Sequence, residues 1–259
     1  MNASNAVTLD RRPGGVTILT LNRPTVLNAI DFEMAGQLAT TLADLTNDDQ
    51  TSVLVITGAG RGFCSGADLQ ALAAGLPNWP SKLDMMHYVT RPMRELNRLP
   101  HLTIAAVNGP AIGAGWGLAM GCDIRIAGPT ARFGATFIRL GLGPDYGLSQ
   151  SLPRTIGRER AIELLATGRL IDAEEAHRIG VFSTRSEDPL CAAITLADTI
   201  AAAPLRAIRS IKSTLDRATH ATFADVITNI EANAQAALFD HPHFESDSAA
   251  WFAYHTPDH

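Results

Sequence analysis

The chain has 259 residues, of which 46% are hydrophobic and 18% are charged, and its formal net charge is −5. This is the composition of an ordinary globular protein with a substantial core. Lysine and arginine are dispersed along the chain and form no basic stripe, so no nucleic-acid partner is indicated, although a small anionic ligand is compatible with the composition.

Residues 102–122 carry no charge and are long enough to raise the question of a membrane span. Asn108, Pro110 and five glycines in this stretch argue against one. Residues 1–15 contain no basic start followed by an apolar run, so no secretory signal is predicted. We therefore expect a cytoplasmic protein without a membrane span.

The first half of the chain alternates predicted strands and helices. Apolar runs predict strands at 16–21, 53–57 and 103–107. A helix is predicted to begin at Asp31 as N-cap, and a second follows the strand at 53–57. The apolar faces of these two helices are predicted to comprise Met34, Leu38, Leu42 and Leu45 in the first, and Leu83, Met86, Met93 and Leu96 in the second. Repeated strand and helix units predict an α/β core.

Beyond Ile156 the pattern becomes mostly helical, with helices predicted at 161–166, 173–179, 190–202, 207–215 and 223–239. Pro204 marks a break, so we divide the chain into a core at 1–203 and a helical region at 204–259. The last part ends in aromatic side chains, namely Phe244, Trp251, Phe252 and Tyr254. Because this region has few partners of its own, we interpret it as an oligomerisation element.

Two segments present a glycine-containing corner between a strand and a helix start. They are FCSGADL at Phe63–Leu69 and NGPAIGAGWGLAMGCD at Asn108–Asp123. The first N–H groups of a helix lack partners within the helix and lie at the positive end of its dipole. Two such donors near a developing oxyanion stabilise it by about 3 kcal/mol each. By residues alone, close packing of the backbone explains these corners equally well.

Other candidate sites are weaker. Gly58, Gly60 and Gly62 lack the spacing of a dinucleotide loop and the lysine of a phosphate-binding loop. No partner base is nominated for Ser65 or Cys64 as a nucleophile. We interpret the three cysteines, Cys64, Cys122 and Cys191, as buried thiols. No further ligand follows His241 and His243 at metal spacing, so no metal is predicted.

Four motifs occur in order along the chain: LNRPTVLNAI from Leu21, FCSGADL from Phe63, AAVNGPAIGAGWGLAMGCDIRIA from Ala105, and ARFGATFIRLGLGPDYGLSQSLPRTIG from Ala131. Together they resemble the crotonase superfamily, the enoyl-CoA hydratases and isomerases, from about Leu21 to Phe252. The resemblance implies an α/β spiral of ββα repeats, and a helical C-terminal region that builds a homotrimer or a dimer of trimers. It also implies an acyl-CoA thioester as ligand, with no cofactor beyond the coenzyme A of the substrate.

The resemblance also implies the site residues. The oxyanion donors would be the N–H groups of Ala67 and Ala114. Glycine commonly stands where Ala114 does, and alanine serves if its φ is negative. The thioester would be bound along 25–29 and 65–69, although a lysine often found at the position of Thr25 is missing. The implied substrate contacts are Val26, Leu27, Ala29, Ser65, Ala67, Asp68, Leu69, Gly109, Ala114, Phe137 and Leu142.

Hydratases of this family use two glutamates, because adding water across a double bond requires groups that activate the water and manage a proton. The corresponding positions here are Gly117 and Phe137, neither of which can transfer a proton. An ordinary hydratase is therefore not expected.

Asp145, in GLGPDYGLSQSLPR, is the remaining candidate carboxylate. By local sequence alone it is more simply an N-cap. Its setting resembles the acid/base of isomerases that include phenylacetate-pathway enzymes. Near Phe133, Phe137 and Leu142 its pKa would be raised, as suits a proton carrier. The expected reaction is double-bond migration between 2-enoyl and 3-enoyl thioesters.

Two alternatives stay open. Aryl-CoA dehalogenases of the superfamily use an aspartate at this position as nucleophile, together with a histidine and a tryptophan, but Thr90 and Phe137 stand here, with His87 one turn away. A non-catalytic acyl-CoA binder is the other, since the glutamates are missing and bulky Trp116 stands beside a corner. Residues 71–88, with Trp79, Met85 and Met86, are expected to shape the acyl end of the pocket.

Overall fold

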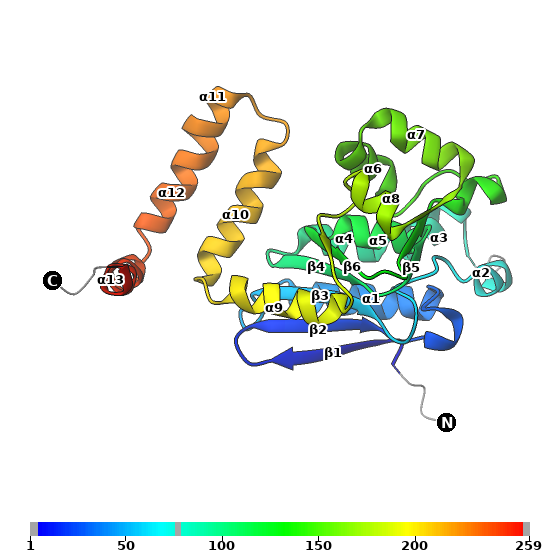
Figure 1. Ribbon diagram of the computed structural model, residues 1–259, viewed down its shortest axis with the longest axis horizontal. Coiled ribbons are helices and arrows are strands. Elements are labelled where there is room, and N and C mark those ends of the chain that lie inside the picture. Colours follow the sequence, from blue (N-terminus) through cyan, green and yellow to red (C-terminus); the bar gives the residue numbers. More distant parts are fainter. Residues whose placement is uncertain (1–4, 76–78, 256–259) are drawn as a thin grey trace. The chain divides into compact units, whose positions relative to one another are not determined.

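The computed structural model describes residues 5–75 and 79–255, with the backbone alone for residues 250–255 (Figure 1). Contacts within the chain divide it into two compact units, residues 1–202 and 203–259. Each unit is described separately below.

A six-stranded sheet in the order β1-β2-β3-β4-β6-β9 forms the centre of the first unit (Figure 1). Its strands are β1 (Val7–Arg12), β2 (Val16–Leu21), β3 (Val53–Gly58), β4 (Leu102–Val107), β6 (Ile124–Ala127) and β9 (Thr184–Arg185). β1 is antiparallel to β2, and every other neighbouring pair is parallel. The three predicted strands are confirmed, whereas β1 was not predicted.

Both faces of the central strands β2, β3 and β4 are buried, which explains why these strands read as continuous apolar runs. Val53 and Val55 of β3 pack in a cluster with α9 (Pro189–Ala201). Leu54 and Ile56 point the other way, into the larger cluster that includes α1 (Phe32–Leu45). Asp31 caps α1 as predicted, accepting a hydrogen bond from the N–H of Met34 at 2.8 Å.

A second sheet of three short strands was not predicted. It consists of β5 (Pro110–Ile112), β7 (Arg132–Gly134) and β8 (Leu170–Asp172). The surrounding elements are α5 (Ala114–Gly121), a 3-10 helix (Thr136–Leu140), α6 (Leu148–Ile156), α7 (Arg158–Thr167) and α8 (Ala173–Arg178). Strands of three residues are too short to show a period of two in the sequence.

The helical segment predicted between β3 and β4 was wrong in one respect, because it consists of two helices. α3 (Lys82–Val89) and α4 (Arg91–Arg98) meet at Thr90, and Pro92 lies in the first turn of α4. Proline lacks an N–H and clashes with the preceding turn, so it starts a new helix here. Leu83 is 64% exposed and is not on a buried face. The preceding helix is α2 (Leu69–Gly75).

The second unit is helical, with α10 (Leu205–Ala218), α11 (Phe223–Asp225), a π-helical turn (Val226–Glu231), α12 (Ala232–Phe239) and α13 (Phe244–His255). An ion pair between Arg206 and Asp247 links α10 to α13. The rings of Phe239 and Phe244 meet edge to face with centroids 4.9 Å apart. The side chains of Trp251, Phe252 and Tyr254 lie outside the described residues.

Two further findings concern predictions made from composition. Cys64 and Cys122 are buried, but Cys191 is exposed on α9, so the prediction of three buried thiols was wrong for one. No single helix in the described ranges is long and apolar enough to cross a membrane. Within these ranges, only α9 and α10 taken together reach the length and the apolar composition of a membrane span.

Candidate active site

The two predicted corners lie side by side. β3 and β4 are parallel neighbours, so their carboxyl ends reach the same edge of the sheet, and each corner follows one of them. Cys64 donates its N–H to the carbonyl of Pro110 at 3.0 Å, and Ile112 donates to the carbonyl of Cys64 at 2.9 Å. A β-carbon at Gly66 would lie 3.7 Å from the backbone nitrogen of Ala114. Ala67 and Ala114 therefore belong to one site.

The backbone of Ala114 is suited to donating its N–H into this site. Ala114 is the first residue of α5, and Gly113 makes the turn before it with φ +55. Ala114 is not among the residues with positive φ, so alanine meets the condition for serving at this position. No backbone acceptor is found in the described ranges for the N–H of Ala67 or of Ala114.

Two asparagines that sequence reasoning missed hold the segment between β3 and the first corner. The side-chain amide of Asn108 donates to the carbonyls of Gly58 and Gly60, each at 2.9 Å. The buried amide of Asn28 donates to the carbonyl of Gly62 at 2.8 Å. Asn28 has φ 57, a left-handed conformation that asparagine tolerates. Asn28 and Asn108 lie within the recognised motifs, which was the signal available for finding them.

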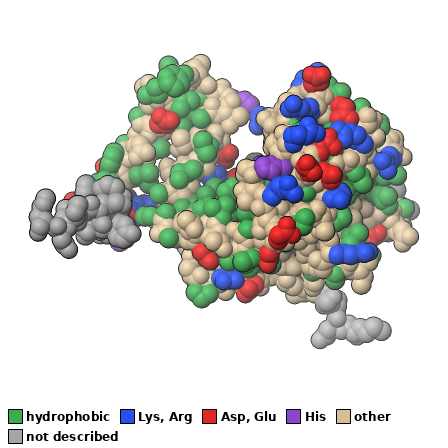
Figure 2. All heavy atoms as spheres, in the orientation of Figure 1, with side chains coloured by type: hydrophobic (Ala, Val, Ile, Leu, Met, Phe, Trp, Pro, Cys, Tyr) green, Lys and Arg blue, Asp and Glu red, His purple; other side chains and the backbone are tan. Residues whose placement is uncertain are grey.

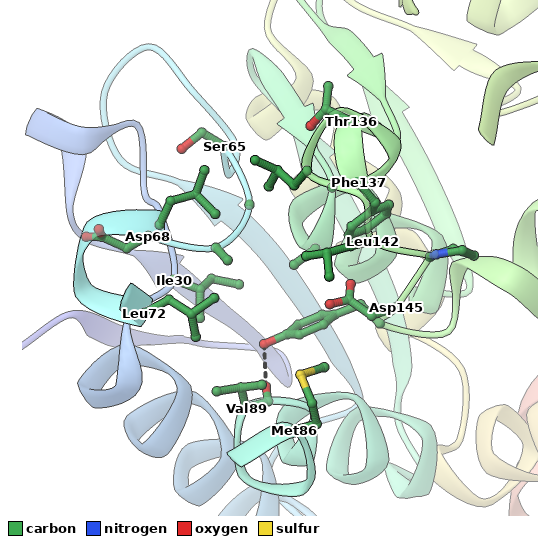
Figure 3. A pocket seen from close by; sticks show the side chains of 18 of the residues that line it. Ile30, Ser65, Asp68, Leu72, Met86, Val89, Thr136, Phe137, Leu142 and Asp145 are labelled. Atoms are coloured by element: carbon green, nitrogen blue, oxygen red, sulfur yellow. Dashed lines mark hydrogen bonds between the residues drawn. The ribbon is translucent and has the colours of Figure 1, made fainter. Parts of the chain in front are cut away.

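A cavity of about 430 Å³ opens beside the two corners. Figure 3 shows Asp145 between Leu142 and Met86, with Ile30 and Leu72 on the opposite wall. Of the predicted site residues, those that line this cavity are Ser65, Ala67, Asp68, Leu69, Ala114, Phe137, Leu142 and Asp145. Leu140, Val89 and Phe32 add to its mainly apolar wall.

Four predicted contacts, Val26, Leu27, Ala29 and Gly109, do not line the cavity. The carbonyls of Val26 and Leu27 accept hydrogen bonds from the hydroxyl and the N–H of Ser65 at 3.1 and 2.9 Å. Their loop therefore lies next to the first corner, outside the cavity itself. Gly109 is buried, and a β-carbon there would stand 2.1 Å from the carbonyl oxygen of Arg61. Gly109 thus permits close packing of two backbone segments.

Of the three carboxylates that line the cavity among the described residues, two are paired. Arg23 contacts Asp31 at 3.0 Å and Asp68 at 3.1 Å. Asp68 also accepts a hydrogen bond from the N–H of Ala71, and this bond together with Arg23 lowers the pKa of Asp68. A lowered pKa keeps the Asp68 carboxylate ionised and unsuited to carrying a proton near neutral pH.

Asp145, unlike Asp31 and Asp68, forms no ion pair with Arg23. The N-cap of α6 is Gly147, and no side-chain hydrogen bond caps that helix, so the interpretation of Asp145 as an N-cap was wrong. Its Oδ1 atom is buried and has no hydrogen-bond partner in the described part of the chain. Burial raises the pKa of Asp145 to about 6, because desolvation disfavours the charged carboxylate. A carboxyl with such a pKa can both take up and release a proton near neutral pH.

Most of the other residues singled out from the sequence do not line the cavity. Trp116 is fully buried against Phe133, with ring centroids 6.0 Å apart. Trp79 stacks between Phe32 and Tyr88, with centroids 5.5 and 5.1 Å away. Met86 lines the cavity, whereas Met85, His87 and Thr90 do not. In the described ranges, no group of three histidine, cysteine or acidic side chains is placed to hold a metal.

Comparison with known proteins identifies the family to which this site belongs. A profile of the family "Enoyl-CoA hydratase/isomerase" matches residues 11–256. The chain is 38% identical over 242 residues to the probable enoyl-CoA hydratase EchA14 of Mycobacterium tuberculosis, covering 91% of this chain and 93% of that protein. It is 43% identical over 188 residues to the 1,2-epoxyphenylacetyl-CoA isomerase of Escherichia coli, covering 71% of this chain and 70% of the relative.

Solved structures of enoyl-CoA hydratases have the same fold as this chain. An enoyl-CoA hydratase from Bacillus anthracis superimposes with a TM-score of 0.89 at 30% identity, covering 98% of each chain. The chain combines two sheets, two facing backbone corners and an apolar cavity beside them, and the family profile identifies this arrangement as that of an acyl-CoA enzyme. The chain belongs to the enoyl-CoA hydratase/isomerase family, the crotonase superfamily, which confirms the resemblance and the fold expected from the sequence.

Proposed function

We propose that this protein moves a double bond between the 2-enoyl and 3-enoyl positions of an acyl-CoA thioester, with Asp145 carrying the proton. The observation that supports this most directly is the state of Asp145, a cavity carboxyl with a pKa of about 6 whose Oδ1 has no hydrogen-bond partner among the described residues. The two glutamate positions of hydratases hold Gly117 and Phe137, which leaves no second proton carrier at either.

In the proposed reaction, the thioester oxygen accepts hydrogen bonds from the N–H groups of Ala67 and Ala114. Ionised Asp145 takes a proton from C2 of the 3-enoyl thioester, and the electron pair moves to the thioester oxygen to give a dienolate. The protonated carboxyl then returns the proton to C4, and the double bond forms between C2 and C3. Asp145 ends ionised, and no water is consumed. The two N–H donors stabilise the dienolate oxygen.

The CoA part of the substrate is expected along residues 25–29 and 65–69, where Thr25 provides no cation for a phosphate. Arg61 is an exposed cation that lies between β3 and the first corner. A β-carbon at Gly60 would lie 3.0 Å from the β-carbon of Pro24, and one at Gly62 would lie 3.3 Å from that of Leu27. Arg61 therefore extends from a turn that packs on this loop and is our candidate for contacting the phosphates.

A hydrolytic dehalogenase would use Asp145 as nucleophile and would need a base to activate water. No histidine is among the described residues that line the cavity, and His87 is exposed on α3. No observation favours this alternative over isomerisation.

Oligomerisation through the second unit is also part of the proposal. Phe223 is 81% exposed, Leu215 65% and Phe239 59%, and Figure 2 shows apolar side chains spread over the visible face of this unit with few charged ones among them. Large apolar side chains exposed in this number on one helical unit are typical of an interface with another chain. A trimer or a dimer of trimers is expected, and light scattering that shows a monomer would remove this part of the proposal.

Double-bond migration tests the proposed function. A panel of 3-enoyl-CoA and 2-enoyl-CoA thioesters is followed by the absorbance of the conjugated thioester, with wild type and Asp145→Asn compared. Conversion that Asp145→Asn abolishes, with CoA-ester binding retained, would support an isomerase that uses Asp145. Binding without turnover in either protein would show an acyl-CoA binder instead, and halide release from a haloaryl-CoA would show a dehalogenase.

A further inference from the structure

The residue after Asp145 has an unusual backbone. Tyr146 has φ 51, in the left-handed region that residues with a side chain rarely adopt, and Gly147 follows with φ 75. A non-glycine residue in this region costs free energy and persists only where the surroundings hold it there. Such conformations gather at functional sites, so the contacts that hold Tyr146 are informative.

Tyr146 is held from two sides. Its phenol donates a hydrogen bond of 2.6 Å to the carbonyl of Val89, the last residue of α3. A dashed line marks this hydrogen bond in Figure 3. On the other side Tyr146 packs on Gly117 of α5, where an added β-carbon would lie 2.5 Å from its β-carbon and 2.8 Å from its carbonyl oxygen. The side chain is 4% exposed. Tyr146 therefore bridges the wall of the cavity to the helix that begins at Ala114.

The Asp145 carboxyl is held only locally, because the hydrogen bond that acts on its pKa comes from its own backbone N–H. Its Oδ1 atom is buried without a hydrogen-bond partner among the described residues, so no polar side chain fixes that atom. The position of the carboxyl then depends on the backbone of residues 145 and 146. The other titratable groups that line the cavity are Asp31 and Asp68, both paired with Arg23, and the Tyr146 phenol itself.

We propose that Tyr146 is a positioning residue, which holds the Asp145 carboxyl in the apolar part of the cavity through its bridge between α3 and α5. This inference rests on the proposed role of Asp145 as acid/base. Loss of the phenol frees one end of the bridge, so the left-handed turn relaxes and water reaches the carboxyl. Displacement of a reacting group by about 1 Å can lower the rate by up to about 10²-fold, and we expect the effect to fall mainly on turnover.

The test compares Tyr146→Phe with a matched control, Tyr88→Phe. The Tyr88 phenol also donates to a backbone carbonyl, that of Phe32 at 3.2 Å, but Tyr88 does not line the cavity. Each substitution removes one hydroxyl and one such hydrogen bond. The first readout is an infrared titration of the protonated carboxyl of residue 145, assigned by its absence from Asp145→Asn. The second is the pH profile of kcat/KM for double-bond migration.

Tyr146→Phe should move the titration of Asp145 toward the ordinary aspartate range and lower kcat by about tenfold, with KM changed less than about threefold. Tyr88→Phe should leave the titration and kcat as in wild type. A titration unchanged in Tyr146→Phe, or moved equally by both variants, would overturn the inference. The infrared readout needs no turnover, so it decides the role of Tyr146 even if Asp145→Asn proves that Asp145 carries no proton in the reaction.

Discussion

Gly117 of α5 lies so close to Tyr146 that a β-carbon at residue 117 would stand 2.5 Å from the β-carbon of Tyr146. The resemblance of the motifs to the family implies that Gly117 stands where hydratases carry a glutamate. The space that such a side chain would need is filled here by Tyr146. The absence of this glutamate is therefore part of the packing of the site as well as a difference in sequence.

We predict that Gly117→Glu alone does not create a hydratase. Overpacking against Tyr146 should destabilise the fold by roughly 1–3 kcal/mol or more. Phe137→Glu is the comparison, because the side chain of residue 137 already extends into the open cavity and should cost less. Thermal unfolding and hydration of a 2-enoyl-CoA measure the two effects. Gly117→Glu with wild-type stability would contradict the packing described here.

The raised pKa of Asp145 predicts the pH dependence of the reaction. In the direction from 3-enoyl to 2-enoyl, Asp145 must be ionised in the free enzyme, so kcat/KM should rise with pH through about 6 and level off above it. Measuring kcat/KM from pH 4.5 to about 8.5 with one 3-enoyl-CoA shows this limb. A midpoint near the ordinary aspartate value of 3.8 would mean that the carboxyl is solvated.

The same pKa predicts a pH-dependent change in stability. Asp145 is harder to ionise in the folded chain than in the unfolded chain, so it lowers stability as pH rises from about 4 through 6 and has no such effect below both pKa values. Asn cannot ionise. At pH 8 the free energy of unfolding of Asp145→Asn should therefore exceed that of wild type by up to about 3 kcal/mol, and its unfolding midpoint should be higher.

The measurement is the difference in unfolding midpoint between Asp145→Asn and wild type across this range of pH. The difference should shrink toward zero on acidification to about pH 3.5. A difference that stays constant with pH would show that Asn acts through packing or hydrogen bonding and that the Asp145 pKa is not raised.

The backbone donor at Ala114 can be removed without removing the helix. Ala114 is the first residue of α5, a position that accepts proline because its N–H has no partner within the helix. Ala114→Pro should lower kcat by about 10²–10³, with little loss of thermal stability. Ala114→Ser keeps the N–H and serves as control. Equal activity in the two variants would exclude the Ala114 N–H as an oxyanion donor.

Much of this architecture was predictable from local patterns. The apolar runs at β2, β3 and β4 predicted strands correctly, because both faces of a parallel sheet are buried. The cap at Asp31 followed from its place before an amphipathic helix. The break at Thr90 could have been predicted from Pro92. The three-residue strands β5, β7 and β8 could not, since nothing in so short a segment distinguishes strand from loop.

The candidate site shows the same division. The motifs placed Ala67, Ala114 and Asp145 in order along the chain and pointed to an acyl-CoA thioester as ligand. Gly109 was predicted from the same motifs to contact the substrate, but it packs against the carbonyl of Arg61 and does not line the cavity. A glycine in a motif indicates close backbone approach, but the sequence does not say whether ligand or protein comes close.

By itself, the sequence determined the α/β class and the family motifs, because both depend on residue identity and local order, and it supports the prediction that both hydratase glutamates are replaced. Only the tertiary structure decided that the Asp145 carboxyl lies in the cavity instead of capping α6, and that Tyr146 fills the space beside Gly117. A pKa depends on the burial and hydrogen bonds that distant segments supply. Those contacts exist only after α3, α5 and the segment at 145–147 have packed together.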